Sequence, residues 1–153
     1  MTPVLNLATQ APYFYANFAF TGFASQGGRQ FAVGPDGLYE LSGDTDAGEP
    51  IVAHVTTGLS DLGTPLLKTV DAAYVGYTAD QDLTLTATVG QADGAVSIDY
   101  PLAETADAMT QARIKLGKGV KARYWQFALS NQAGGDFTFE TLEVLPVVLG
   151  RRI

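Results

Sequence analysis

The sequence predicts an all-β protein: an antiparallel β-sandwich, jelly-roll-like, with about ten short strands and little or no helix. Apolar and polar residues alternate along much of the chain, which is the period of a strand with one buried face. Turn-forming runs such as Gly34-Pro35-Asp36-Gly37 separate the alternating segments. No motif recurs at a fixed period, which argues against a propeller.

The alternation is cleanest over residues 83–100. Residues 83–89 alternate leucine, alanine and valine with three threonines, so one face is apolar and the other is polar. The pattern returns over residues 96–100, and Asp93-Gly94 between the two runs is typical of a tight turn. We therefore expect a β-hairpin here.

Similar patterns predict the remaining strands. In the strand expected over residues 121–129, Arg123, Trp125 and Phe127 would share one face. The other expected strands cover residues 13–23, 29–33, 38–41, 51–57, 68–78, 113–116 and 137–144.

Two segments depart from simple alternation. The apolar residues of the last expected strand change parity near Glu140 and Thr141, which indicates a β-bulge. Residues 101–110 form the one stretch of helix-forming composition, and we expect at most a single helical turn there.

The length of 153 residues is typical of one domain. Residues 1–12 contain two prolines without periodicity and are expected to form an extended arm that reaches a partner. Residues 13–148 would form a single sandwich domain, and residues 149–153 a C-terminal tail. No apolar run approaches the ~20 residues of a membrane-spanning helix, and residues 1–10 lack the pattern of a secretory signal.

Charge is distributed unevenly along the chain, whose formal net charge is −7. Residues 1–110 hold two bases and thirteen acids, whereas residues 111–153 hold seven bases and three acids. Such asymmetry favours head-to-tail contacts between copies or with a complementary neighbour. The alternative is that bases and acids pair within one molecule, and the sequence leaves both interpretations open.

The residues offer little for catalysis. The chain has no cysteine, which excludes disulfides, thiol catalysis and cysteine-based metal sites. His54, Ser60 and Asp61 are the residue types of a hydrolase triad, but no nucleophile elbow surrounds Ser60. We expect no enzyme activity, no catalytic residue and no cofactor.

A metal site is not assigned either. Asp44, Asp46 and Glu49 are the weak candidates, because alternating carboxylates on a glycine-bearing loop suit calcium. Their spacing does not match a calcium loop of the helix-loop-helix type, since Gly48 stands at its fifth position.

A basic group is the strongest candidate for a partner interface. Five bases fall within eleven residues without an acid among them, and two arginines stand near the C-terminus. Nucleic-acid binding through these charges is opposed by the acidic balance of the whole chain. The predicted interface residues are Arg113, Lys115, Lys118, Lys121, Arg123, Arg151 and Arg152.

Three aromatic residues could instead form a sugar-binding platform. Tyr74, Tyr77 and Trp125 are the candidates for glycan contact. A place in the hydrophobic core is the competing interpretation for each of them, because they stand at alternating positions.

Several strings in their order resemble structural proteins of tailed bacteriophages, in particular tail-tip and baseplate components. The similarity covers roughly residues 20–153 and depends on the order and spacing of the strings together. The strings are Asp36-Gly37-Leu38-Tyr39, Gly43-Asp44-Thr45-Asp46, Thr57-Gly58-Leu59-Ser60-Asp61-Leu62-Gly63, Lys68-Thr69-Val70, Tyr74-Val75-Gly76-Tyr77, Gly117-Lys118-Gly119, Ala122-Arg123-Tyr124-Trp125-Gln126-Phe127 and Arg151-Arg152-Ile153.

The resemblance implies a structural virion protein without enzymatic activity, made in the host cytoplasm and located in the tail or baseplate. Its implied partners are copies of itself and other tail or baseplate proteins. The alternative is a carbohydrate- or receptor-binding β-sandwich module of a phage tail.

Overall fold

The computed structural model describes residues 1–91, 94–102, 105–117 and 119–150. It is all-β, with 62% of residues in strands and no helix among the described residues, which confirms the predicted fold class. The strands form several antiparallel sheets. The chain divides into two compact units, Met1–Gly43 and Asp44–Ile153, which we describe separately.

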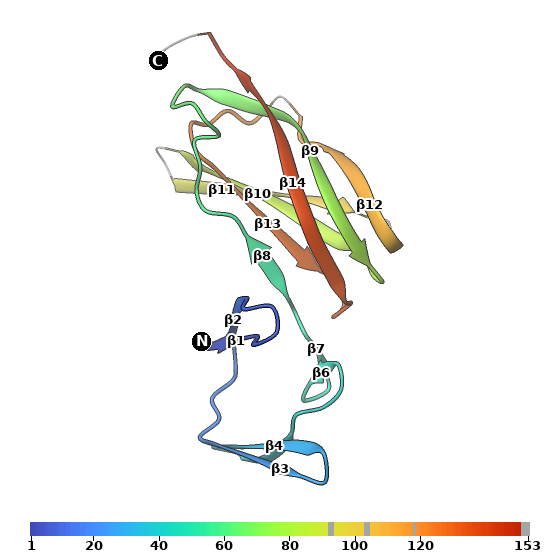
Figure 1. Cartoon of the computed structure of the whole chain (residues 1–153). Helices are drawn as coiled ribbons and strands as arrows, with labels where there is room; N and C mark the ends of the chain where they lie inside the picture. Colours follow the sequence, from blue (N-terminus) through green and yellow to red (C-terminus); the bar gives the residue numbers. More distant parts are fainter. Residues whose placement is uncertain (92–93, 103–104, 118, 151–153) are drawn as a thin grey trace. The chain divides into compact units, whose positions relative to one another are not determined.

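The unit Met1–Gly43 consists of two small sheets. One is a hairpin of two strands, and the other is a three-stranded meander (Figure 1). Gly27 and Gly28 connect the first two strands of the meander, and their positive φ angles of 59° and 80° suit a tight hairpin turn. The strands are β1 (Thr2–Leu5), β2 (Pro12–Tyr15), β3 (Gly22–Gln26), β4 (Arg29–Gly34) and β5 (Gly37–Glu40).

Two expectations for this region are wrong. Residues 1–12 are not an extended arm, because β1 pairs with β2 along its whole length. Residues 13–43 do not belong to the sandwich, and the strand expected over residues 13–23 is interrupted after Tyr15. After this interruption, Phe18 packs against Phe20 within the same unit, with ring centroids 4.7 Å apart.

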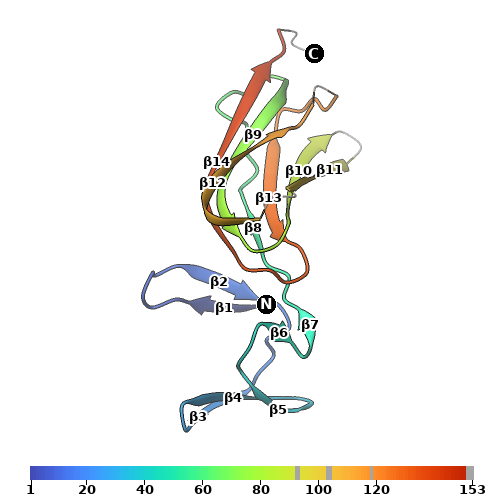
Figure 2. The same cartoon turned by 90° about the vertical axis from the view of Figure 1, so that its right-hand side faces the viewer.

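The unit Asp44–Ile153 contains the β-sandwich. Figures 1 and 2 show a four-stranded sheet, in the order β11-β10-β13-β8, facing a three-stranded sheet, in the order β12-β9-β14. Among the described residues, seven strands therefore form the sandwich, and a short hairpin precedes it. The strands are β6 (Thr45–Asp46), β7 (Glu49–Pro50), β8 (His54–Thr56), β9 (Lys68–Ala79), β10 (Leu83–Gln91), β11 (Gly94–Leu102), β12 (Ala106–Lys115), β13 (Trp125–Asn131) and β14 (Phe137–Val148).

Strict alternation builds the core between the two sheets. The apolar residues of β10 are at most 2% exposed, while its threonines are partly exposed. Leu85 pairs with Leu129, Ala87 with Phe127 and Val89 with Trp125, so both strands bury the same face. The predicted hairpin over residues 83–100 is confirmed by the continuous pairing of β10 with β11.

The edge strand β14 contains the predicted bulge. Its register against β9 shifts between Phe139 and Thr141, and it shifts again between Val144 and Pro146. Proline has no amide donor, and bulges twist a strand away from its neighbours. Both features therefore discourage the free side of β14 from pairing with another strand.

Two local expectations are corrected. Residues 106–110 are strand rather than a helical turn, because β12 pairs with β9 at Ala106 and again from Thr110 onward, and tertiary pairing overrides composition. Arg123 does not share the buried face of Trp125 and Phe127, since β13 begins only at Trp125 and Arg123 is exposed.

Asn131 fixes the segment that leads into β8. Its Oδ1 accepts a hydrogen bond from the Ala53 amide at 2.9 Å. Its Nδ2 donates to the carbonyls of Ile51 and Gly135, both at 2.9 Å. Asn131 is 8% exposed, so loss of this amide would leave partly buried backbone groups without partners.

We expect Asn131→Ala to lower the free energy of unfolding by about 2–4 kcal/mol, because it removes three partly buried hydrogen bonds of a buried side chain. Chemical denaturation measures this change. Ser130→Ala is the matched control and should cost less than about 0.5 kcal/mol. Equal losses for the two variants would contradict the role given to Asn131.

We also expect Gly76→Ala to destabilise the protein, because a Cβ there would lie 2.5 Å from Oγ1 of Thr141 at the bulge. The cost should be about 1–3 kcal/mol in denaturation experiments. Adding Thr141→Ala should recover most of it. Gly90→Ala is the control, since nothing lies within 4 Å of a Cβ at Gly90.

Candidate functional site

The sandwich has two ends, and they carry opposite charge. Strands β9 to β14 run alternately up and down, so each connection between them lies at one end or the other. Acidic side chains lie in the β9–β10 and β13–β14 connections at one end, here called the acidic end. Basic side chains occupy the β12–β13 connection at the other, here called the basic end.

The acidic end is formed where β9 stops and β12 and β14 start. The Asp80 amide donates to the Asp136 carbonyl at 3.2 Å, and the Gln132 amide donates to the Asp82 carbonyl at 3.0 Å. Asp80, Asp107 and Asp136 line an open cleft of about 390 Å³, together with Ala79 and Phe137. These aspartates are exposed, so their charge is available to a partner.

The β6–β7 hairpin adds charge near the same end. A Cβ built on Gly134, in the β13–β14 connection, would lie 3.0 Å from Cβ of Pro50, which places Pro50 beside that turn. Ala47 and Gly48 form the hairpin turn with φ angles of 51° and 92°, as a two-residue turn requires. This turn makes Asp46 and Glu49 a cross-strand pair, and both are exposed.

The basic end contains the exposed side chains of Lys115, Lys121 and Arg123. Arg113 lies slightly inward on β12, where its guanidinium is 3.8 Å from a carboxylate oxygen of Asp71. Both side chains of this pair are partly exposed, so it contributes little to stability.

Lys68 lies at the basic end but is buried. It begins β9, is 0% exposed, and its backbone forms a bridge with Ala122. Its ammonium donates to the Arg123 carbonyl at 2.5 Å, which holds the β12–β13 connection against β9. Burial lowers the pKa of the Lys68 ammonium, and the nearby Asp61 carboxylate raises it by a smaller amount.

A second cleft of about 320 Å³ opens between β11 and β12. Tyr77, Leu102 and Ile114 line it with buried side chains, and Arg113 and Lys115 lie along its border on the edge strand. The Tyr100 hydroxyl, which also lines it, donates to the Leu116 carbonyl at 2.9 Å and so connects the two sheets. Burial raises the pKa of this hydroxyl.

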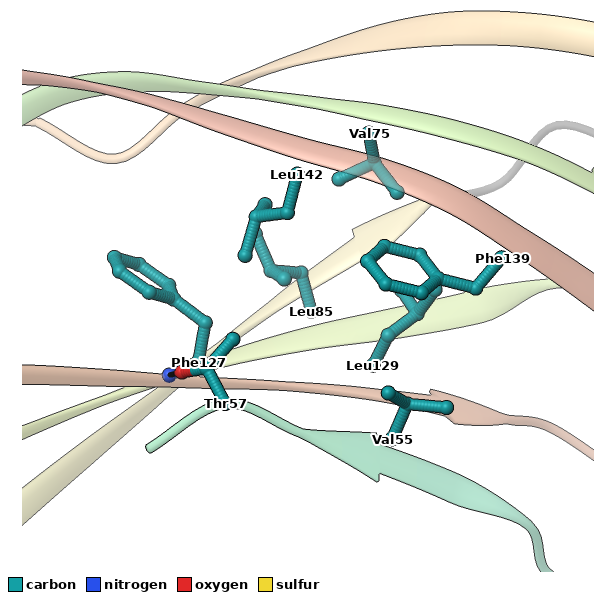
Figure 3. A pocket seen from close by; sticks show the side chains of 8 residues that line it. All are labelled: Val55, Thr57, Val75, Leu85, Phe127, Leu129, Phe139 and Leu142. Carbon is teal, nitrogen blue, oxygen red and sulfur yellow. Dashed lines mark hydrogen bonds between the residues drawn. The ribbon is translucent and has the colours of Figure 1, made fainter. Parts of the chain in front are cut away.

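The space between the sheets next to β8 is packed core. Figure 3 shows Val75, Phe139 and Leu142 of one sheet facing Leu85 and Leu129 of the other. The cavity among them is only about 10 Å³ and its lining is almost wholly apolar, so it suits neither a ligand nor an ordered water.

The structure brings only part of the predicted interface group together. Lys115, Lys121 and Arg123 are exposed at the basic end, with Arg113 beside them. Lys118, Arg151 and Arg152 lie outside the described residues.

The triad residues are not brought together. His54 pairs with Ser130 and Ser60 bridges to Trp125, positions that are about 16 Å apart along β13 at 3.3 Å per residue. Ser60 and Asp61 act locally, because their side-chain oxygens accept turn amide bonds at 3.0 Å.

The weak metal candidates Asp44, Asp46 and Glu49 do not form a binding group. Among the described residues, no three acids, histidines or cysteines gather closely enough to hold a metal ion.

The glycan candidates separate into core and surface. Tyr77 is 0% exposed and Trp125 is 2% exposed, so neither ring can stack on a sugar. Tyr74 is half-buried, and its cross-strand neighbours are Arg113 and Glu143. The core interpretation therefore holds for two of the three residues.

Sequence reasoning missed the residues that define the acidic end of the sandwich. Asp80 and Asp82 lie in the β9–β10 connection, and Asp136 immediately precedes β14. A search of the sequence for acids at the ends of the expected strands would have found all three. Only the topology shows that Asp107, on another strand, shares that end.

Comparison with protein-family models, curated proteins and solved structures finds no match in any of the three. In the described part of the chain, no helix is long and apolar enough to cross a membrane.

We expect Lys68→Met to change how stability depends on pH. The pKa of Lys68 in the folded chain lies below its ordinary value of 10.5. Between the two values the unfolded chain binds more protons, so the free energy of unfolding rises with pH across that interval. The variant should lose this rise.

Denaturation at a series of pH values from neutral to about 10.5 tests this expectation for both proteins. Lys115→Met, at an exposed position of the same end, is the control and should keep the wild-type profile. Parallel profiles for wild type and Lys68→Met would show that Lys68 titrates normally.

Proposed function

We propose that this chain is a structural subunit of a tailed-bacteriophage virion, assembled in several copies in the tail or baseplate through protein–protein contacts. The resemblance of its ordered strings to tail-tip and baseplate proteins supports the phage assignment. The observation that carries the assembly role is the apolar surface of the unit Met1–Gly43.

That unit buries very little of its own apolar surface. Ala32 is its one buried residue, although all 43 positions are described. Phe14 and Leu38 are 68% and 69% exposed, and Phe23 is 63% exposed. Units of about 40 residues without disulfides or metals are usually stable only when a further surface covers them.

The exposed residues lie on faces that the unit itself leaves uncovered. Pro3 pairs with Phe14 on the first hairpin, and Val33 pairs with Leu38 on the meander, so each pair shares one face of its sheet. Apolar patches of this kind mark protein–protein contacts. The unit carries few charges, and Arg29 donates a hydrogen bond to Glu40 at 2.6 Å, so little charge opposes such a contact.

We expect the purified chain to be an oligomer in solution, and Phe14→Ser with Leu38→Ser to lower its mass toward the monomer. Light scattering after size-exclusion chromatography measures the mass. Leu59→Ser, which alters a side chain of similar exposure in the other unit, should leave the mass unchanged. A wild-type chain that is monomeric at micromolar concentration would contradict this part of the proposal.

The phage assignment has its own test. Antibodies raised against the purified chain should label the tails of phage particles whose genome encodes it, in immunogold electron microscopy. Labelling of heads alone, or of no tailed particle, would overturn the assignment.

A further inference from the structure

The two ends of the sandwich are oppositely charged along the direction of its strands. Among the described residues, the acidic end and the adjoining β6–β7 hairpin hold seven acids and no base. The acids are Asp44, Asp46, Glu49, Asp80, Asp82, Asp107 and Asp136. The basic end holds five bases, Lys68, Arg113, Lys115, Lys121 and Arg123, against two acids, Asp61 and Asp71.

Exposed charge without an ion pair to a described residue is present at both ends. Two ion pairs of described residues are Arg29 with Glu40 and Arg113 with Asp71. Lys115 and Lys121 are exposed and have no ion pair with a described residue, and the same holds for Asp107 and Asp136. These four side chains are therefore available for contacts with another copy.

The lining of the cleft at the acidic end suits a lysine side chain. The cleft at the acidic end has Asp80, Asp107 and Asp136 along its border and Phe137 in its lining. A lysine side chain suits such a cleft, because its aliphatic part can contact an aromatic ring while its ammonium meets carboxylates. At the basic end, the exposed Lys121 belongs to the strand connection that follows β12.

We infer that the basic end of one copy binds the acidic end of the next, with Lys121 of the β12–β13 connection in the cleft between Asp80, Asp107 and Asp136. The contact is heterologous, since it joins different surfaces of identical chains, and its repetition gives a ring or a linear file of copies. This inference rests on the proposed function and adds to it a second contact between subunits.

Charge reversal tests the contact in the full chain. The variant Asp107→Lys with Asp136→Lys reverses the charge of two side chains of the acidic cleft, and the variant Lys115→Glu with Lys121→Glu reverses the charge of two exposed lysines at the basic end. All four residues are exposed, so the fold should persist, as circular dichroism and thermal melting can show. Each variant alone should lose end-to-end association by about 100-fold, because like charges then face each other.

Mixing provides the matched control. An equimolar mixture of the two variants should associate again in alternation, as should a single chain that carries all four substitutions. Sedimentation velocity measures this association. Association of either double variant at wild-type strength, or a mixture that stays dissociated, would overturn the inference.

Salt separates this contact from the apolar one. Raising salt from about 0.01 M to about 1 M shortens the Debye length from roughly 30 Å to roughly 3 Å, so end-to-end association should weaken. Association through Phe14 and Leu38 should persist, since apolar contacts do not depend on charge. Association that does not weaken as salt is raised would overturn the end-to-end contact and leave the proposed function unaffected. Absence of immunogold label from tails would overturn the proposed function and leave the end-to-end contact unaffected.

Discussion

The up-and-down course of the sandwich strands determines most other features of the larger unit. Because neighbouring strands are antiparallel and most of the connections are short, every turn falls at one of two ends. Alternation then directs apolar side chains into a single core between the sheets, where Trp125 and Phe127 stack with centroids 6.1 Å apart. Among the described residues, acids then predominate at one end of the sandwich and bases at the other.

The same topology leaves open sheet edges, and different features oppose further strand pairing at each of those described next. On β14, two register shifts and Pro146 oppose pairing with a further strand. On β11 and β12 the cleft is bordered by Arg113 and Lys115, and Tyr100 bonds across it to Leu116. Growth of the molecule by continuous sheet is thus discouraged, which leaves ends and apolar faces as the surfaces where neighbours can bind.

Local pattern predicts local structure well in this chain. The hairpin over residues 83–100 and the bulge near Thr141 follow from alternation and its change of parity, because both depend on neighbouring residues. The separation of Met1–Gly43 could not be predicted, since its aromatic residues alternate as core residues do and only three-dimensional contacts assign them elsewhere. Burial of Lys68 was equally hidden, because lysine is rarely buried and nothing around it in sequence signals the Arg123 carbonyl.

The path of the chain through the sandwich has a mechanical consequence. The chain enters beside Asn131 through β8 and leaves through β14, where Val148 pairs with Lys68 at the opposite end. A pull between these points acts parallel to the strands, and the ladder hydrogen bonds are perpendicular to it. The bonds of β8 with β13 and of β14 with β9 therefore bear the load together in shear instead of opening one after another.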